Sequence, residues 1–261
     1  MRGLILAAGR GSRMSKLTDD RPKCLSLLDG QPLIAWQLAA LTAAGAGEVG
    51  IVSGYRAEML EGFGARRFHN PRWAETNMVR SLAAATEWLE AGDCLVSYGD
   101  IFYSPATVAA LAAAPGEIAI AYDPAWLALW RRRSADPRAD AETFARDPEG
   151  WLTEIGGQVA DVEAVQGQYM GLLKLTPAGW AGVLRLVASL PAAAADRLDM
   201  TSLLRLALEA GTAIATVANR HPWGEVDTAD DLALYHAMMA AGELPRFACL
   251  AAAPPSSPDR T

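Results

Sequence analysis

Hydrophobic residues along the chain form short continuous runs separated by stretches with helical spacing. Residues 3–8 are an apolar run that predicts a buried first strand. Residues 32–44 have apolar side chains at helical spacing and end before Gly45, which predicts a helix. Residues 48–53 form a second short run and predict another strand. A strand, a helix and a strand with short connections are typical of a parallel sheet with crossover helices.

The alternation continues along most of the chain. A strand end and a turn at Asn70-Pro71 are expected within residues 67–73. Further helices are predicted at residues 77–91, 107–113, 177–189, 200–210 and 228–241. Further strands are predicted at residues 94–98, 118–122, 168–175 and 213–217, the last of which is expected to be the final regular strand. The predicted fold class is therefore α/β, with a Rossmann-like, mostly parallel sheet flanked by helices.

One segment, at about residues 123–165, departs from this alternation. Charged and aromatic side chains become frequent there, which predicts a small insertion or lid on the same face as the ligand site. Within it, residues 151–154 and 159–162 are expected to pair as a hairpin around Gly156 and Gly157. Residues 248–261 are rich in Ala, Pro and Ser and are expected to form a disordered tail, which leaves residues 1–247 as a single domain.

The composition narrows the class of ligand and the compartment. With 261 residues, 51% of them hydrophobic, the chain is long enough to bury a core of ordinary size. A net charge of −7 argues against a nucleic-acid-binding surface and favours a small substrate. The three cysteines have no C-x-x-C spacing, so neither a disulfide framework nor a zinc site is predicted. No signal peptide is expected before the first strand, no apolar run reaches membrane-spanning length, and a reducing cytoplasm is the expected location.

The most informative stretch of the chain follows the first predicted strand. Glycines at positions 9 and 11 let the backbone approach a ligand closely and turn its N–H groups toward phosphate oxygens. Basic side chains follow within the same loop, at Arg13, Lys16, Arg21 and Lys23. The dinucleotide fingerprint is not met, because Met14 occupies the third glycine position, and the G-K-[ST] of a P-loop is missing as well. The loop therefore predicts a polyphosphate site of another kind, with a tight turn carrying incidental basic residues as the alternative.

What this loop does match is L-A-A-G-x-G-x-R followed about ten residues later by P-K. This order resembles the opening signature of the sugar-nucleotide type nucleotidyltransferases, which join an NTP to a phosphorylated acceptor and release pyrophosphate. The resemblance implies that the loop binds the nucleotide through Leu6, Ala7, Ala8, Gly9, Gly11 and Ser12. Lys23 is expected to reach the α-phosphate or the acceptor phosphate, and Arg13 to hold the β- and γ-phosphates.

Two aspartates are candidate ligands for a magnesium ion. Asp100 ends the motif Tyr98-Gly99-Asp100, and Asp227 ends Trp223-Gly224-Glu225-Val226-Asp227. Carboxylates on separate rigid elements, together with substrate phosphates, suit Mg²⁺. In the family that the chain resembles, a G-D motif and a later E-V-D motif fill this role. Either aspartate alone reads equally well as a turn residue.

Motifs further along the chain indicate a branch of that family. They are Asn70-Pro71, Asn77-Met78-Val79-Arg80-Ser81-Leu82, Tyr98-Gly99-Asp100-Ile101, Gln168-Tyr169-Met170-Gly171 and the segment around Asp227. The set resembles the phosphocholine and phosphonate cytidylyltransferases, which activate small phosphorylated or phosphonate compounds with CTP. Asn77 and Ser81 lie one helical turn apart and are expected to contact the base or the acceptor, with capping by Asn77 and a surface Ser81 as the alternative.

An acceptor with an amine or ammonium group is expected to be held by aromatic faces. The candidates are Trp126, Trp130, Trp151, Tyr169 and Trp223. The i, i+4 spacing of the first two equally predicts core packing of a lid helix, and residues 131–133 read as a solvated arginine run or as contacts to an acidic acceptor.

The function predicted is a Mg²⁺-dependent cytidylyltransferase that uses CTP and a small phosphorylated or phosphonate acceptor, such as phosphocholine or 2-aminoethylphosphonate. A sugar 1-phosphate uridylyl- or thymidylyltransferase is the alternative within the family, and a catalytically inactive nucleotide-binding regulatory domain is the alternative outside it. The identity of the acceptor and the oligomeric state stay open, a homodimer included.

Overall fold

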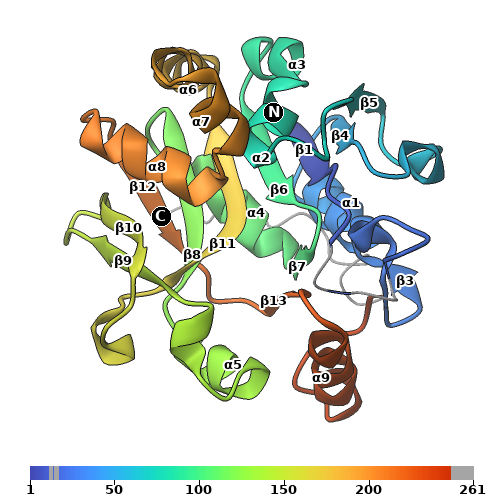
Figure 1. Cartoon of the computed structure of the whole chain (residues 1–261). Coiled ribbons are helices and arrows are strands. Elements are labelled where there is room, and N and C mark those ends of the chain that lie inside the picture. The colour runs from blue at the N-terminus through green and yellow to red at the C-terminus, as the bar shows by residue number, and fades with distance from the viewer. Residues whose placement is uncertain (12–13, 15–17, 248–261) are drawn as a thin grey trace.

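The computed structural model describes residues 1–11, 14 and 18–247 (Figure 1). Seven strands form the central sheet in the order β12-β8-β11-β6-β1-β4-β5. β11 runs antiparallel to both of its neighbours, β6 and β8, and the other pairings in this sheet are parallel. The strands are β1 (Arg2–Ala7), β4 (Val49–Ser53), β5 (Arg66–His69), β6 (Cys94–Tyr98), β8 (Ile118–Asp123), β11 (Gln168–Leu175) and β12 (Ile214–Ala218). The mostly parallel sheet is thus confirmed.

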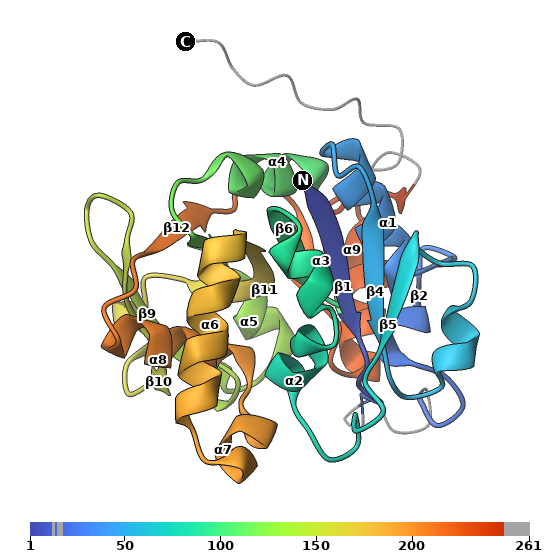
Figure 2. The same cartoon turned by 90° about the horizontal axis from the view of Figure 1, so that it is seen from above.

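Helices cover both faces of this sheet (Figures 1 and 2). One face carries α1 (Leu33–Ala43) and α4 (Pro105–Ala113), and α9 (Ala229–Ala240) lies on the same side. The opposite face carries α2 (Met78–Ala83), α3 (Thr86–Glu90), α6 (Pro177–Ser189), α7 (Ala192–Arg197) and α8 (Met200–Glu209). No helix in the described ranges is both long enough and apolar enough to cross a bilayer.

The two faces of the sheet have separate cores because successive side chains of a strand point to opposite sides. In β1, Ile5 and Ala7 belong to the core beneath α1, whereas Leu4 and Leu6 belong to the core beneath α2. All four side chains are buried. This explains why the first strand is a continuous apolar run, as expected for a parallel strand covered on both faces.

The hairpin predicted around Gly156 and Gly157 is wrong. The segment between β8 and β11 contains α5 (Trp126–Arg133) and a hairpin of β9 (Glu142–Arg146) with β10 (Leu152–Gln158), so both glycines lie within a strand. The turn is instead Asp147-Pro148-Glu149-Gly150, closed by a 3.1 Å hydrogen bond from the Gly150 N–H to the Asp147 carbonyl. Asp, Pro and Gly at these positions favour such a turn. The pairing register shifts near Gly156, which has a φ of +79°, so the glycine marks an irregularity in the strand.

Two further predictions need correction. The helix predicted over residues 77–91 is broken between α2 and α3, where the Thr86 hydroxyl donates a 2.8 Å hydrogen bond to the Ala83 carbonyl and the Ala84 N–H bonds to the Ser81 carbonyl, three residues back. The strand at residues 213–217 is not the last one, because β13 (Trp223–Glu225) pairs with β7 (Ile101–Tyr103). A third small pair joins β2 (Leu27–Leu28) and β3 (Gln31–Pro32).

Candidate active site

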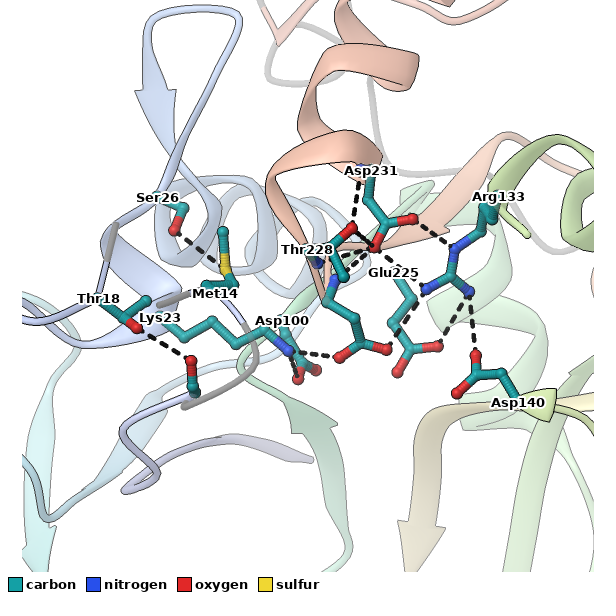
Figure 3. Close-up of polar contacts among 12 residues, drawn as sticks. Met14, Thr18, Lys23, Ser26, Asp100, Arg133, Asp140, Glu225, Thr228 and Asp231 are labelled. Atoms are coloured by element: carbon teal, nitrogen blue, oxygen red, sulfur yellow. Dashed lines mark hydrogen bonds and ion pairs between the residues drawn. The ribbon is translucent and has the colours of Figure 1, made fainter. Parts of the chain in front are cut away.

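Three residues that the sequence places far apart meet at the carboxyl end of β6 (Figure 3). The Lys23 ammonium donates hydrogen bonds to Asp100 Oδ2 at 2.7 Å and to Asp227 Oδ1 at 2.6 Å. The Lys23 and Asp227 side chains are 10% and 5% exposed, and Asp100 is 23% exposed. Burial alone would lower the pKa of Lys23, but the two carboxylates outweigh burial and raise it. Lys23 is therefore a fixed positive charge within the site.

Each of these side chains is positioned by its own local structure. Lys23 begins a short 3₁₀ helix, Lys23–Leu25, directly after Pro22. Asp100 lies in the tight turn between β6 and β7, and its carbonyl accepts a 2.9 Å hydrogen bond from the Val226 N–H. That bond ties the turn to the segment that carries Asp227. Asp227 itself precedes α9, and its N–H donates to Asp231 Oδ2 at 2.9 Å.

The first turn of α9 holds this segment rigidly. Thr228 is the N-cap, and it forms a capping box with Asp231. The Asp231 carboxylate accepts hydrogen bonds from the backbone N–H groups of Asp227 and Thr228. Because both of these donors are satisfied, the backbone of Asp227 is held by the start of α9.

Glu225 is a third carboxylate of the site, and the sequence prediction did not include it. It ends β13, and oxygens of Asp100, Glu225 and Asp227 lie within 4.8 Å of one another. Burial, followed by the charges of Asp227 and Asp100, raises the pKa of Glu225 to about 8. The sequence contains a signal for Glu225, because residues 225 and 227 are two positions apart. Side chains at that spacing in extended backbone lie on the same side of the chain.

These carboxylates fit a divalent cation. Asp100 Oδ1 is buried and accepts no hydrogen bond from the described residues. In the described part of the chain, five carboxylates of this cluster contact Lys23 or Arg133. Carboxylates supply the hard oxygen donors that suit Mg²⁺. A bound Mg²⁺ would be held by Asp100, Glu225 and Asp227.

Arg133, the last residue of α5, is the second basic member of the cluster (Figure 3). Its side chain is 6% exposed and donates to Asp231 Oδ1 at 2.9 Å, to Glu225 Oε2 at 3.4 Å and to Asp227 Oδ2 at 3.4 Å. Burial would lower its pKa, but Asp231 and the surrounding carboxylates outweigh burial and raise it. Arg131 and Arg132 instead pair at the surface with Glu163 and Glu243. The interpretation of a solvated run is thus wrong for Arg133.

A cavity of about 260 Å³ opens beside Lys23 and Asp100. Among the residues that line it are all the predicted nucleotide-binding residues that the structure describes, namely Leu6, Ala7, Ala8, Gly9, Gly11, Asn77 and Ser81. Ser12 and Arg13 lie outside the described residues, as do Lys16 and the predicted tail. Six lining residues are not among the predicted site residues: Cys24, Trp73, Thr76, Met78, Tyr98 and Gly99. The loop, the end of β1 and the start of α2 thus border one cavity.

Asn77 and Ser81 share this cavity and also have structural partners. Asn77 caps α2, with its side-chain oxygen accepting from the Met78 N–H, and it is exposed. Ser81 is buried, not on the surface, and its hydroxyl accepts a 3.0 Å hydrogen bond from the Asn70 side chain. The capping alternative therefore holds for Asn77, whereas a surface Ser81 does not.

Glycine is required at position 11 by the backbone conformation there and by the neighbouring side chain of Lys23. Its φ is +74°, in the left-handed region that favours glycine. A Cβ at this position would lie 2.8 Å from both Cβ and Cδ of Lys23. The absence of a side chain at residue 11 thus allows the Lys23 side chain to pass the loop and reach the carboxylates.

A second cavity, of about 160 Å³, adjoins the first, since Tyr98 lines both. Glu225 of the carboxylate cluster also lines it, so the cluster lies where the two cavities meet. Acidic and aromatic side chains contribute to its wall, among them Asp140, Glu142, Trp130 and Tyr169. The two acidic residues had no recognisable signal in the sequence.

The five aromatic residues predicted for an acceptor cage do not gather in one place. Trp130 and Tyr169 line the second cavity. Trp126 and Trp223 are buried, and their ring centroids lie 5.8 and 6.1 Å from that of Trp130. Core packing therefore accounts for these two. Trp151 pairs with the start of β12 and borders Gly116, at the amino end of β8, so it lies apart from the other candidates for the acceptor cage.

Comparison with known proteins identifies the family. A model of the MobA-like NTP transferase domain matches residues 3–155, more than half of the chain. The chain belongs to the MobA-like NTP transferase family. This NTP transferase is 34% identical over 186 residues to the CTP:phosphoglutamine cytidylyltransferase of Campylobacter jejuni, covering 67% of this chain and 73% of that one. The nucleotidyltransferase resemblance drawn from the opening loop is confirmed.

Further relatives match shorter parts of the NTP transferase. The choline-phosphate cytidylyltransferase of Streptococcus pneumoniae is 34% identical over 93 residues, 34% of this chain and 41% of that one. The 2-aminoethylphosphonate cytidylyltransferase of Lancefieldella rimae is 33% identical over 106 residues, 39% of this chain and 43% of that one. Both belong to the predicted branch. Among solved structures, the inositol-1-phosphate CTP transferase from T. maritima has a TM-score of 0.73 over 93% of this chain and 96% of that one. The two sequences are 20% identical, so this likeness shows a shared fold.

Proposed function

We propose that this enzyme transfers CMP from CTP to a small phosphorylated or phosphonate acceptor and releases pyrophosphate, with Mg²⁺ as the metal. The observation that carries the proposal is the contact of Lys23 with Asp100 and Asp227 where the two cavities meet. In nucleotidyl transfer an oxygen of the acceptor phosphate or phosphonate attacks the α-phosphorus of CTP and pyrophosphate leaves, so both substrates must meet at one point with positive charge placed there. The names of the cytidylyltransferase relatives support CTP as the donor.

In this proposal the nucleotide binds in the first cavity. The backbone of Gly9 and Gly11 faces the phosphates, and Lys23 lies beside the α-phosphate, where its charge stabilises the oxygens on which negative charge develops. Asn77 and Ser81 contact the base side of the same cavity. Ser12 and Arg13 are assigned to the phosphates on sequence grounds alone. Bound Mg²⁺ supplies charge neutralisation at the phosphates, and Asp100, Glu225 and Asp227 hold it.

The acceptor occupies the second cavity. Its phosphate or phosphonate end points toward Lys23, and its far end meets Asp140, Glu142, Trp130 and Tyr169. Carboxylates beside aromatic faces favour an amine or ammonium group. Relatives named for choline-phosphate and 2-aminoethylphosphonate agree with such an acceptor. The relative named for phosphoglutamine adds an acceptor of amino-acid type to the candidates.

A panel of nucleotides and acceptors tests this proposal. Pyrophosphate release is measured with CTP, UTP, dTTP, ATP and GTP, each paired with phosphocholine, 2-aminoethylphosphonate or glucose 1-phosphate, with and without Mg²⁺. We expect release with CTP, an amine-bearing acceptor and Mg²⁺ together. Preference for UTP or dTTP with the sugar phosphate would favour a sugar-nucleotide synthase instead. Release with no pair would leave a nucleotide-binding domain without catalysis.

A further inference from the structure

The guanidinium of Arg133 links four acidic side chains from two stretches of the chain, one at residue 140 and one at residues 225–231. Its nitrogens contact Asp231 at 2.9 Å, Glu225 and Asp227 at 3.4 Å, and Asp140 at 3.8 Å (Figure 3). Two of these residues, Glu225 and Asp227, belong with Asp100 to the group of three carboxylates that suits a divalent cation. Arg133 is thus the point where the segment between β8 and β11 touches that cluster.

The geometry of these contacts divides the oxygens of Asp227 between two cations. Arg133 donates to Oδ2, and Lys23 donates to Oδ1. Arg133 likewise donates to Oε2 of Glu225. A planar guanidinium with donors in a fixed fork can hold several carboxylates in defined orientations, which a lysine ammonium cannot do. Arg133 therefore holds the carboxylates of Glu225 and Asp227 through contacts of 3.4 Å.

Arg133 also connects the cluster to the wall of the second cavity. Its guanidinium carbon lies 4.8 Å from the centroid of the Trp130 ring, and both Trp130 and Glu225 line that cavity. Trp130 lies one helical turn before Arg133 on α5, so the two side chains are on one side of the helix. Any displacement of α5 therefore moves the contact with Glu225 and Asp227.

We infer that Arg133 is a positioning residue that orients Glu225 and Asp227 for the metal and couples the placement of α5 to the metal site. The inference rests on the proposed metal-dependent reaction, but it is tested through metal binding alone. Outer-shell partners of metal ligands typically change metal affinity by about 10–100-fold, and the same range is expected here. The exposed neighbours Arg131 and Arg132 provide matched controls, because each has one surface partner outside the cluster.

The experiment is titration of the full-length protein with Mn²⁺, followed by electron paramagnetic resonance of the free ion. Arg133→Gln and Arg133→Lys are compared with Arg131→Gln and Arg132→Gln, all at a temperature where each variant is folded by circular dichroism. We expect both Arg133 variants to bind Mn²⁺ more weakly and both controls to match the unmodified protein. Turnover of Arg133→Lys with CTP should recover in part when Mg²⁺ is raised, whereas the KM for CTP at saturating Mg²⁺ should change little.

Two results would overturn the inference. One is Mn²⁺ affinity in Arg133→Lys equal to that of the unmodified protein; this variant keeps the charge, so it decides the matter even if Arg133→Gln does not fold. The other is an equal loss in the Arg131→Gln control, which would indicate a general effect of charge. If the Arg133 variants lose Mn²⁺ but the unmodified protein transfers no CMP, the positioning role stands and the proposed reaction fails. If the unmodified protein transfers CMP but the Arg133 variants bind Mn²⁺ with unaltered affinity, the proposed reaction stands and the positioning role fails.

Discussion

Lys23 Nζ lies 2.6 Å from Oδ1 of Asp227, although 204 positions separate the two residues along the chain. The contact brings together the loop after β1 and the segment before α9. Asp227 is buried and also contacts Arg133, so it lies between Lys23 and Arg133. In the proposed reaction it is both a metal ligand and the partner that holds Lys23 in place.

Asp227→Asn should therefore reduce turnover severely. Loss of an outer-shell partner of a metal ligand costs about 10–100-fold, and loss of a direct ligand should cost at least about a hundredfold. Asp230→Asn is the matched control, because Asp230 is exposed in the first turn of α9. Steady-state turnover of both variants at saturating CTP is the measurement. Near-normal turnover of Asp227→Asn would remove Asp227 from the site.

Substitution of Gly11 should damage the site through Lys23. In Gly11→Val the new Cβ meets the Lys23 side chain, and the residue must also adopt a left-handed φ, which costs about 1–2 kcal/mol. Displacement of Lys23 by about 1 Å could lower turnover on the order of a hundredfold. Gly30→Ala is the control, since Gly30 has a φ of +73° but no atoms within 4 Å of an added Cβ. Both variants should lose thermal stability, and only Gly11→Val should lose turnover; equal turnover in the two would contradict the role of the Lys23 contact.

The raised pKa of Glu225 predicts a pH dependence of stability without metal. The folded protein holds the proton of the Glu225 carboxyl group more tightly than the unfolded chain does, so this protonation adds to the free energy of unfolding. The contribution is complete below a pH of 4.5, the ordinary pKa of glutamate. It is lost as the pH rises from there to about 8. We expect the melting temperature of the unmodified protein to fall relative to that of Glu225→Gln across this window, and added Mg²⁺ to reduce the fall. Parallel melting curves for the two proteins would count against the raised pKa.

Substitution of Tyr169 should weaken binding of the acceptor and leave binding of the nucleotide unchanged. A cation against a desolvated aromatic face is worth about 2 kcal/mol, so Tyr169→Leu should raise the KM of an amine-bearing acceptor roughly thirtyfold. The KM for CTP should hardly change. Trp126→Phe is the control, because Trp126 is buried and packs against Trp130 away from the cavity wall. The idea fails if the unmodified enzyme uses a neutral hydroxyl analogue of the acceptor as well as the amine.

Much of the site could be predicted because its residues follow strands of a parallel sheet. The loop after β1 and the turn after β6 meet at one edge of the sheet, and this brings Lys23 and Asp100 together. Arg133 could not be predicted, since three consecutive arginines look alike in the sequence. Its closest acidic partner, Asp231, is 98 positions away and belongs to the cap of another helix. Long-range partners of this kind depend on tertiary packing, which local patterns do not contain.

The same distinction applies to the fold. Strands such as β1 and β6 are buried on both faces and appear as apolar runs, so they were predicted within one or two residues. β13 has three residues and exists only through its pairing with β7, more than a hundred positions earlier, so no local pattern marks it. The predicted hairpin is misplaced because two adjacent glycines are a weaker turn signal than Asp147-Pro148-Glu149-Gly150, which forms the turn between β9 and β10.

Phosphorus NMR of a reaction with CTP, Mg²⁺ and 2-aminoethylphosphonate tests the central claim most directly. The spectrum shows whether the phosphorus of the acceptor becomes linked to the phosphorus of CMP. We predict a pair of coupled resonances from the new P–O–P linkage, together with pyrophosphate, and neither in a parallel reaction with Asp227→Asn. Hydrolysis of CTP without the new linkage, or an equal yield from Asp227→Asn, would contradict CMP transfer at this site.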